Sequence, residues 1–289
     1  MGTETSTVVY RALALGAGAQ SSVLALLLSR SDSRLAKLGY PKPNVAVFAD
    51  TGWEPEYVYQ HLDWLEEQLT FPLIRVSDGN IRTNLKQGRT VSGHRFVDVP
   101  LFILGEDGKK GILRRQCTNH YKIRPIYRRT RALAGGKRGR PFPKNTHVEM
   151  WLGISLDEVS RMKPSREPWV EHRWPLVDMG MTREECIDWF SLEYPDRYLP
   201  RSACVICPYR SDEHWLELKR TEPSSYTEAV RFDRWLRHSA KNPVRQLLNG
   251  RPYLHAARRP LESVMAERET EDTNGSNPFN QECEGLCGV

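Results

Sequence analysis

The strongest constraint on the fold is a short pattern near the start of the chain. The apolar run Val8–Leu15 is rich in strand formers, stops at the glycine-containing segment Gly16–Ser22, and is followed by Val23–Leu28, which indicates a buried helix. A turn of this kind between a strand and a helix suits phosphate, because backbone N–H groups point outward and the helix N-terminus adds partial positive charge. The residues that we predict to bind nucleotide phosphates here are Gly16, Ala17, Gly18, Gln20, Ser21 and Ser22.

Alternating strands and helices continue along the chain. Asn44–Phe48 is a second short buried strand, Phe71–Val76 is a third, and a helix from Pro55 to Leu69 separates them. Val148–Ile154 indicates a further buried strand. This alternation predicts an α/β fold with an open, mostly parallel sheet and helices on both faces. Ligands of such sheets bind at the carboxyl ends of the strands, so the residues after the second strand, Asp50, Thr51 and Gly52, join the predicted nucleotide site.

Three parts of the chain differ in character. Residues 1–210 carry the strand and helix pattern and form the predicted nucleotide domain, with a mobile loop at Ala134–Lys144. Residues 211–268 are predicted to be a helical extension. Residues 269–289 are polar and rich in turn formers, which predicts a flexible tail that carries Cys283 and Cys287.

Charge and hydropathy narrow the class of protein. The formal net charge is +6, and lysines and arginines cluster between Arg114 and Lys144, a pattern that suits either the phosphates of a nucleotide or those of a nucleic acid, or a solvated loop. No run approaches the roughly 18 apolar residues of a membrane span, and Met1–Thr7 is polar without a signal-peptide pattern. We expect a soluble, cytoplasmic protein.

Two common nucleotide motifs do not fit. Ser21 stands where the dinucleotide fingerprint has its third glycine, and Gly136-Lys137 is followed by Arg138, not by the serine or threonine of a P-loop. Gly16–Ser22 instead resembles the phosphate loop of the adenine-nucleotide α-hydrolase superfamily, which includes PAPS reductases and PP-loop ATP pyrophosphatases.

Other segments resemble that superfamily in the same order, over about residues 8–210 and the tail. They are Phe48–Glu54 (its Asp-Thr-Gly segment), Cys117–Ile126 (its Cys…Lys-Val-x-Pro-Leu element), Gly153–Arg161 (its Gly…Glu…Arg motif), Trp174–Leu176 (its Pro-Leu before a helix) and Glu282–Leu286 (the reductases' terminal Glu-Cys-Gly-Leu). The resemblance implies that Lys122 and Arg161 hold phosphate or sulfate oxygens and that Cys283 is a catalytic thiol. It also implies ATP, with Mg²⁺, or else PAPS or APS as the bound nucleotide.

The sequence also departs from the family pattern. Ala17 replaces a glycine and Gln20 replaces the aspartate of the usual ATP-pyrophosphatase loop, which favours the reductase form. Single-cluster APS reductases carry two adjacent cysteines before the lysine, whereas this chain has Cys117-Thr118. The tail inserts Glu284 and adds Cys287.

The paired cysteines indicate metal, cluster or redox chemistry. Cys204 and Cys207 form a Cys-x-x-Cys turn, whose spacing lets two thiolates bind one metal or one cluster edge. Three interpretations stay open. An iron–sulfur cluster, expected to be 4Fe–4S, would use Cys117, Cys204 and Cys207; a structural zinc would use the Cys-x-x-Cys pair with His120 or the tail cysteines; or the thiols would bind no metal.

Three functions follow from these features. The first is an ATP pyrophosphatase that adenylates an acceptor for sulfur insertion, with a tRNA base or the DNA phosphate backbone as the acceptor that the resemblance implies, and a cysteine desulfurase as a sulfur donor. The second is a PAPS or APS reductase that releases sulfite and uses thioredoxin. The third is a non-enzymatic, zinc-containing module that binds nucleic acid.

Overall fold

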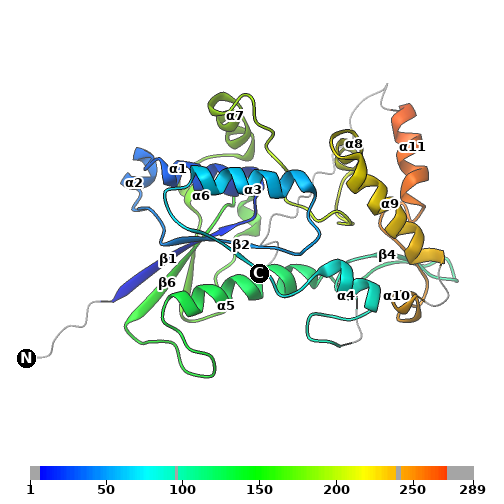
Figure 1. Ribbon diagram of the computed structural model, residues 1–289, viewed down its shortest axis with the longest axis horizontal. Helices are drawn as coiled ribbons and strands as arrows, with labels where there is room; N and C mark the ends of the chain where they lie inside the picture. Colours follow the sequence, from blue (N-terminus) through cyan, green and yellow to red (C-terminus); the bar gives the residue numbers. More distant parts are fainter. Residues whose placement is uncertain (1–6, 95–96, 239–241, 272–289) are drawn as a thin grey trace, which may run out of the picture.

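The computed structural model describes residues 7–94, 97–238 and 242–271. Its centre is a five-stranded sheet in the order β3-β2-β1-β6-β7, and every neighbouring pair of strands is parallel (Figure 1). The strands are β1 (Val8–Leu15), β2 (Val45–Ala49), β3 (Leu73–Val76), β6 (Thr146–Leu152) and β7 (Val170–Arg173). The predicted α/β class with an open parallel sheet is therefore confirmed.

Helices cover both faces of this sheet. One face carries α1, α3, α6 and α7, and α5 packs on the opposite face against β2 and β3 (Figure 1). All eleven residues of α1 are buried, because this helix lies between the sheet and its neighbours α3 and α7. These helices, with the short α2 beside them, are α1 (Ala19–Ser29), α2 (Ser33–Lys37), α3 (Glu56–Gln68), α5 (Arg124–Leu133), α6 (Pro175–Asp178) and α7 (Arg183–Glu193).

A capping box begins α7. Thr182 accepts a hydrogen bond from the Glu185 N–H, and the Glu185 carboxylate accepts one from the Thr182 N–H at 2.7 Å. Two helices are irregular. The π-helix η1 (Thr118–Ile123) contains Lys122 and runs into α5, and the 3₁₀ helix η2 (Leu156–Arg161) follows β6 and ends at Arg161.

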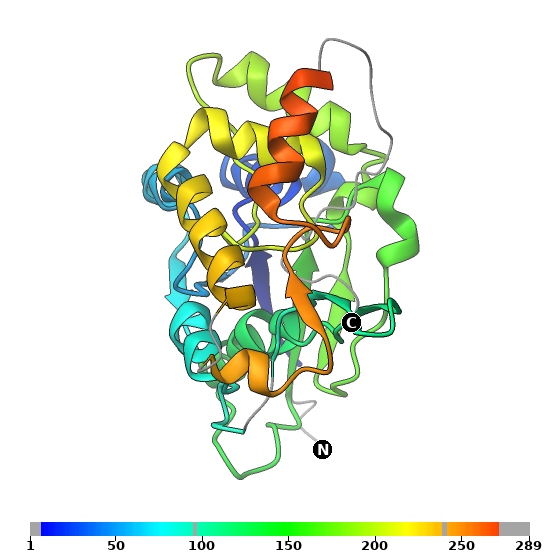
Figure 2. The ribbon, with the colours of Figure 1, turned by 90° about the vertical axis from the view of Figure 1, so that its right-hand side faces the viewer.

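The C-terminal part packs beside the sheet and shares a second hydrophobic core with residues from the first half of the chain. Trp215, Phe232 and Leu254 belong to the same apolar cluster as Ile81 and Val99. Figure 2 turns this part toward the viewer. The elements of this part and of the segments that pack with it are α4 (Ile81–Gln87), α8 (Asp212–Thr221), α9 (Pro223–His238), α10 (Pro243–Gln246), α11 (Leu261–Glu271), β4 (Phe102–Leu104), β5 (Lys110–Ile112) and β8 (Arg251–Tyr253).

The extension is helical as expected, with one addition. β8 pairs antiparallel with β4, which also pairs with β5, so a three-residue strand of the extension completes a small sheet with residues 102–112. A strand this short contains too few residues to show an alternating pattern in the sequence. α11 ends at Glu271, so residues 269–271 of the predicted tail are helical. The rest of that tail, residues 272–289, lies outside the described residues. No helix of the described part is long and apolar enough to cross a membrane.

Candidate active site at the carboxyl edge of the sheet

The predicted phosphate loop joins β1 to α1, and no side chain caps the N-terminus of α1. The first intrahelical bond runs from the Ser22 N–H to the Gly18 carbonyl at 3.0 Å, so the N–H groups of the preceding residues have no partner within the helix. The first turn contains no acidic residue. The end of α1 therefore presents N–H groups and the positive end of its dipole, as an anion site requires.

The loop backbone is held in an unusual conformation. Ala17 has a φ of 58°, in the left-handed region that non-glycine residues rarely adopt. The Gly16 N–H donates to the Ser21 hydroxyl at 3.1 Å, and that hydroxyl donates to the Gly18 carbonyl at 3.3 Å. The family glycine that Ala17 replaces thus has a conformational reason, and here the surrounding contacts hold the strained residue in place.

The turn after β6 closes on the phosphate loop. A Cβ atom at Gly153 would lie 2.8 Å from Ser21 Cα and 2.9 Å from Ser21 N, so only glycine allows this approach. β1 and β6 are neighbours at the centre of the sheet, and the chain continues from them to opposite sides. This is a topological switch point, where ligands of open α/β sheets bind.

A polar chain joins the loop to the segment that carries Arg161. The Gln20 amide donates to the Ser155 hydroxyl at 2.8 Å and to the Glu158 carboxylate at 2.7 Å, and Arg161 pairs with Glu158 at 2.6 Å. The structure therefore connects Arg161 to the phosphate loop through Glu158 and Gln20, and its contact with phosphate stays a prediction. Ser155 and Glu158 were not among the predicted site residues, although both lie in the segment that carries the resemblance.

Ser22 does not face this site. Its side chain is fully buried, and its hydroxyl lies 2.9 Å from Nε2 of His61, a core residue of α3. Its N–H is used inside α1. The prediction that Ser22 binds phosphate is therefore wrong for its side chain. The Ser22 hydroxyl instead contributes to the packing between α1 and α3.

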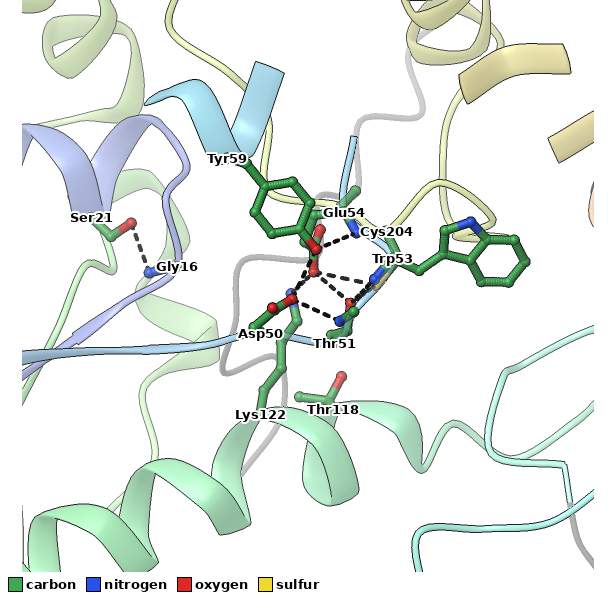
Figure 3. A network of polar contacts seen from close by, with 12 residues as sticks. Gly16, Ser21, Asp50, Thr51, Trp53, Glu54, Tyr59, Thr118, Lys122 and Cys204 are labelled. Atoms are coloured by element: carbon green, nitrogen blue, oxygen red, sulfur yellow. Dashed lines mark hydrogen bonds and ion pairs between the residues drawn. The ribbon is translucent and has the colours of Figure 1, made fainter. Parts of the chain in front are cut away.

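A second group of polar residues follows β2. Asp50 Oδ1 accepts the Gly52 N–H at 2.7 Å and the Tyr59 hydroxyl at 2.9 Å (Figure 3). Gly52 has a φ of 73°, and a Cβ there would lie 2.5 Å from the Asn80 amide nitrogen, so this turn requires glycine. Burial and the nearby Asp50 raise the pKa of Tyr59, which keeps the phenol protonated as a donor to the carboxylate.

Glu54 lies at the centre of this group. Its Oε1 accepts the Thr51 hydroxyl at 3.0 Å and lies 3.6 Å from Lys122 Nζ and 3.5 Å from Cys204 Sγ (Figure 3). The side chains of Lys122 and Glu54 are 8% and 0% exposed. A buried lysine and glutamate of this kind stabilise each other's charge, which neither would keep alone at this depth. Sequence reasoning gave Glu54 no role.

The three predicted cluster cysteines line one cavity. Cys117 lies just before η1, and Cys204 and Cys207 lie in the turn before α8; together with Lys122 and Thr51 they enclose a volume of about 30 Å³. The Cys204 thiol also lies 3.3 Å from the Thr51 hydroxyl. Burial, and then the charge of Glu54, raise the pKa of the Cys204 thiol well above its usual value.

The zinc alternative that used His120 finds no assembled site. His120 Nδ1 lies 2.9 Å from the buried Asp98 carboxylate. Within residues 7–94, 97–238 and 242–271, no group of three or more His, Cys, Asp and Glu side chains is placed to hold a single metal ion. Cys283 and Cys287 lie outside the described residues, so the catalytic role of Cys283 and a zinc set that uses the tail stay predictions.

Comparison with known proteins finds a likeness to solved structures only. No family model matches the sequence, and no curated protein matches it. Twelve chains of solved structures match, and a tRNA thiolase is among them. It is the U34-tRNA thiolase NcsA from Methanococcus maripaludis with its 4Fe–4S cluster, which is 16% identical, with an alignment that covers 100% of this chain and 80% of that chain and a TM-score of 0.40. A likeness at this level assigns no role to any residue of this chain.

Proposed function

We propose that this protein is an adenine-nucleotide-dependent sulfur-transfer enzyme that adenylates an acceptor and then replaces the adenylate with sulfur. The observation that carries the proposal is the meeting of two sets of residues at one edge of the sheet. An open helix end with Arg161 nearby suits the phosphates of ATP, and a cavity lined by three cysteines contains the buried Lys122.

The chemistry fits these residues. In the proposed first step an acceptor oxygen bonds to the α-phosphorus of ATP, and the bond to the β-phosphate oxygen breaks, so pyrophosphate leaves. The N–H groups of α1, Arg161 and Lys122 would stabilise the charge that develops on the phosphate oxygens. A sulfur nucleophile then displaces AMP from the acceptor. Asp50, fixed by Tyr59 and by the Gly52 N–H, would contact the nucleoside.

The cysteine cavity suits a cluster better than a single ion. In a 4Fe–4S cluster each cysteine binds a different iron atom, so the three thiols need not converge on one point, and they do not. The volume of about 30 Å³ is near that of one water molecule, so the cavity as it stands is smaller than a cluster, and the residues that would hold one are Cys117, Cys204 and Cys207. When bound, a cluster with three cysteine ligands supplies an iron with an open position for sulfide.

An exposed basic surface suits a nucleic-acid acceptor. It covers α5 and the loop that follows, and α5 begins directly after the π-helix that carries Lys122. Its lysines and arginines are exposed and form no ion pair with any carboxylate of the described residues; they are Arg124, Arg129, Lys137, Arg138, Arg140 and Lys144. Unpaired cations on one surface attract a polyanion. Both acceptors, tRNA and the DNA backbone, remain open.

The test is anaerobic purification followed by incubation with ATP or PAPS, in the presence of tRNA or DNA. Pyrophosphate release and thiolated nucleic acid support the proposal, whereas sulfite from PAPS would assign the protein to the reductases. Absence of both products would leave a binding module.

The ligand set is tested by metal content. We expect iron to be lost in Cys204→Ala and retained in Cys186→Ala, a matched change at a fully buried cysteine of α7 that does not line the cavity. Stoichiometric zinc without iron, or full iron in Cys204→Ala, would contradict the cluster assignment.

A further inference from the structure

A second, larger cavity lies beside the cysteine cavity. It has a volume of about 850 Å³ and lies between the start of α3, α4 and α9. Val205 lines it, whereas the adjacent Cys204 and Ile206 line the cysteine cavity. The Val205 N–H donates to the Trp53 carbonyl at 2.9 Å. The wall between the two cavities is therefore a single layer of chain, made by residues 204–206 and by Trp53 and Glu54.

The inner end of this cavity contains an unpaired acceptor. Glu54 lines the cavity, its side chain is fully buried, and its Oε2 atom has no hydrogen-bond partner among the described residues. Its other oxygen, Oε1, is the one engaged by Thr51, Cys204 and Lys122. A buried oxygen without a partner is costly. A ligand with an N–H donor would satisfy it once a small shift of the wall exposes the carboxylate, which is 0% exposed in this structure.

The walls of the cavity are aromatic. The Trp53 and Phe232 rings meet edge to face at 5.0 Å, and Phe232 and Trp235 stack at 5.3 Å. The Arg82 guanidinium lies 5.5 Å from the centre of the Trp53 ring. Aromatic faces and arginine planes are the surfaces on which nucleobases stack.

The charges at the cavity favour a nucleotide unit over a long polyanion. Exposed Arg82, Lys86 and Arg231 line the outer part, and four glutamates, Glu54, Glu56, Glu222 and Glu228, line it as well. Two of these glutamates are used within the protein: Glu222 accepts the N–H groups of Glu56 and Tyr57, and Glu228 accepts the Trp53 indole N–H and pairs with Arg82. The cations suit one or two phosphates at the rim, while the acidic residues would repel a strand laid inside.

We propose that this cavity binds one nucleobase, with its ring against the aromatic wall, its N–H edge toward Glu54 and its flanking phosphate at Arg82, Lys86 and Arg231. The inference rests on the proposed function for the source of that base, which is then the nucleic-acid acceptor, splayed out of its strand. A base held there lies one layer of chain from Cys204.

The test measures binding separately from catalysis. Fluorescence anisotropy of a labelled single-stranded RNA, and of the DNA of the same sequence, gives strand affinity for the wild type and for Trp235→Ala. We expect affinity to fall about 5- to 100-fold, the usual loss when a stacking aromatic residue is removed. The matched control is Trp189→Ala, a half-buried tryptophan of α7 outside the cavity, which should bind strands like the wild type.

A second measurement uses strands that lack single bases. When single bases are removed in turn from the strand, the wild type should lose affinity sharply at one abasic position, and Trp235→Ala should lose nothing more there. Equal affinity across the abasic series, or unchanged strand binding by a folded Trp235→Ala, would overturn the proposal. Competition by AMP, GMP, CMP or UMP as strong as that by the strand would mean that the base comes from a free nucleotide. Pyrophosphate release, measured in parallel, reports on the proposed function alone.

Discussion

The approach of Gly153 to the phosphate loop gives a sharp prediction for Gly153→Ala. The added methyl carbon would lie 2.8, 2.9 and 3.1 Å from Ser21 Cα, N and Cβ, and two of these three atoms are backbone. Real Cβ contacts are not this short, so either the loop or β6 must move. Overpacking of this kind costs about 1–3 kcal/mol, against about 0.4–1 kcal/mol regained because alanine restricts the unfolded chain.

A matched control isolates the clash. Gly111 lies in β5, has no positive φ, and a Cβ there would have its nearest neighbour, Ile103 Cβ, at 3.9 Å. Gly111→Ala should therefore be neutral or slightly stabilising. In urea unfolding, Gly153→Ala should lie about 1–3 kcal/mol below Gly111→Ala in free energy of unfolding, judged from their midpoints and slopes.

The same change should weaken nucleotide binding. The methyl group presses on the Ser21 nitrogen, whose N–H lies in the first turn of α1. Losing one hydrogen bond to a charged phosphate costs about 1.5–3 kcal/mol, so ATP affinity in titration calorimetry should fall roughly 10- to 100-fold. If Gly153→Ala matches Gly111→Ala in both stability and ATP affinity, the turn after β6 does not constrain the loop and the switch-point site is wrong.

Three further predictions concern the Lys122–Glu54 pair, Asp50 and the core residue His61. Lys122→Met should lower the free energy of unfolding by about 3–5 kcal/mol, because Glu54 then stays buried without its cation; adding Glu54→Gln should recover part of that loss in the same denaturant assay, and no recovery would contradict the pairing. Tyr59→Phe should weaken ATP binding about 5- to 10-fold, since Asp50 loses a donor, and equal affinity would remove the nucleoside role of Asp50. Burial, with a smaller effect of the Arg197 charge, lowers the pKa of His61 from 6.5 to about 3; the unfolded chain therefore binds a proton that the folded chain does not, and stability should fall as the pH drops below about 6.5, by about 2 kcal/mol at pH 5. This acid sensitivity should shrink in His61→Gln.

The parts of the fold that sequence reasoning captured are those whose signal is local. β1 was expected and found at Val8–Leu15, because a buried central strand of a parallel sheet is a continuous apolar run. β2 and α3 follow for the same reason, from apolar runs and spacing. β4 and β8 have three residues each and β7 has four, so their pairing depends on partners far away in the chain.

The candidate site divides in the same way. The phosphate loop and the Cys-x-x-Cys pair are local patterns, whereas the arrival of Cys117 and Lys122 at Cys204 depends on where the π-helix η1 is placed against β2. Glu54 was missed because nothing in its own surroundings in the sequence marks it as buried. Its importance comes from Lys122 and Cys204, which only the fold brings to it.

The departure at position 20 has a physical explanation in its neighbours. The Gln20 amide nitrogen donates to Glu158 at 2.7 Å, and Glu158 in turn pairs with Arg161. The aspartate of the resembled loop would put a second carboxylate toward Glu158, and two adjacent carboxylates are stable only with a proton or a cation between them. A neutral amide removes that repulsion. In this chain Gln20 and Glu158 therefore complement each other, and the cation at this end of the loop is the Arg161 guanidinium.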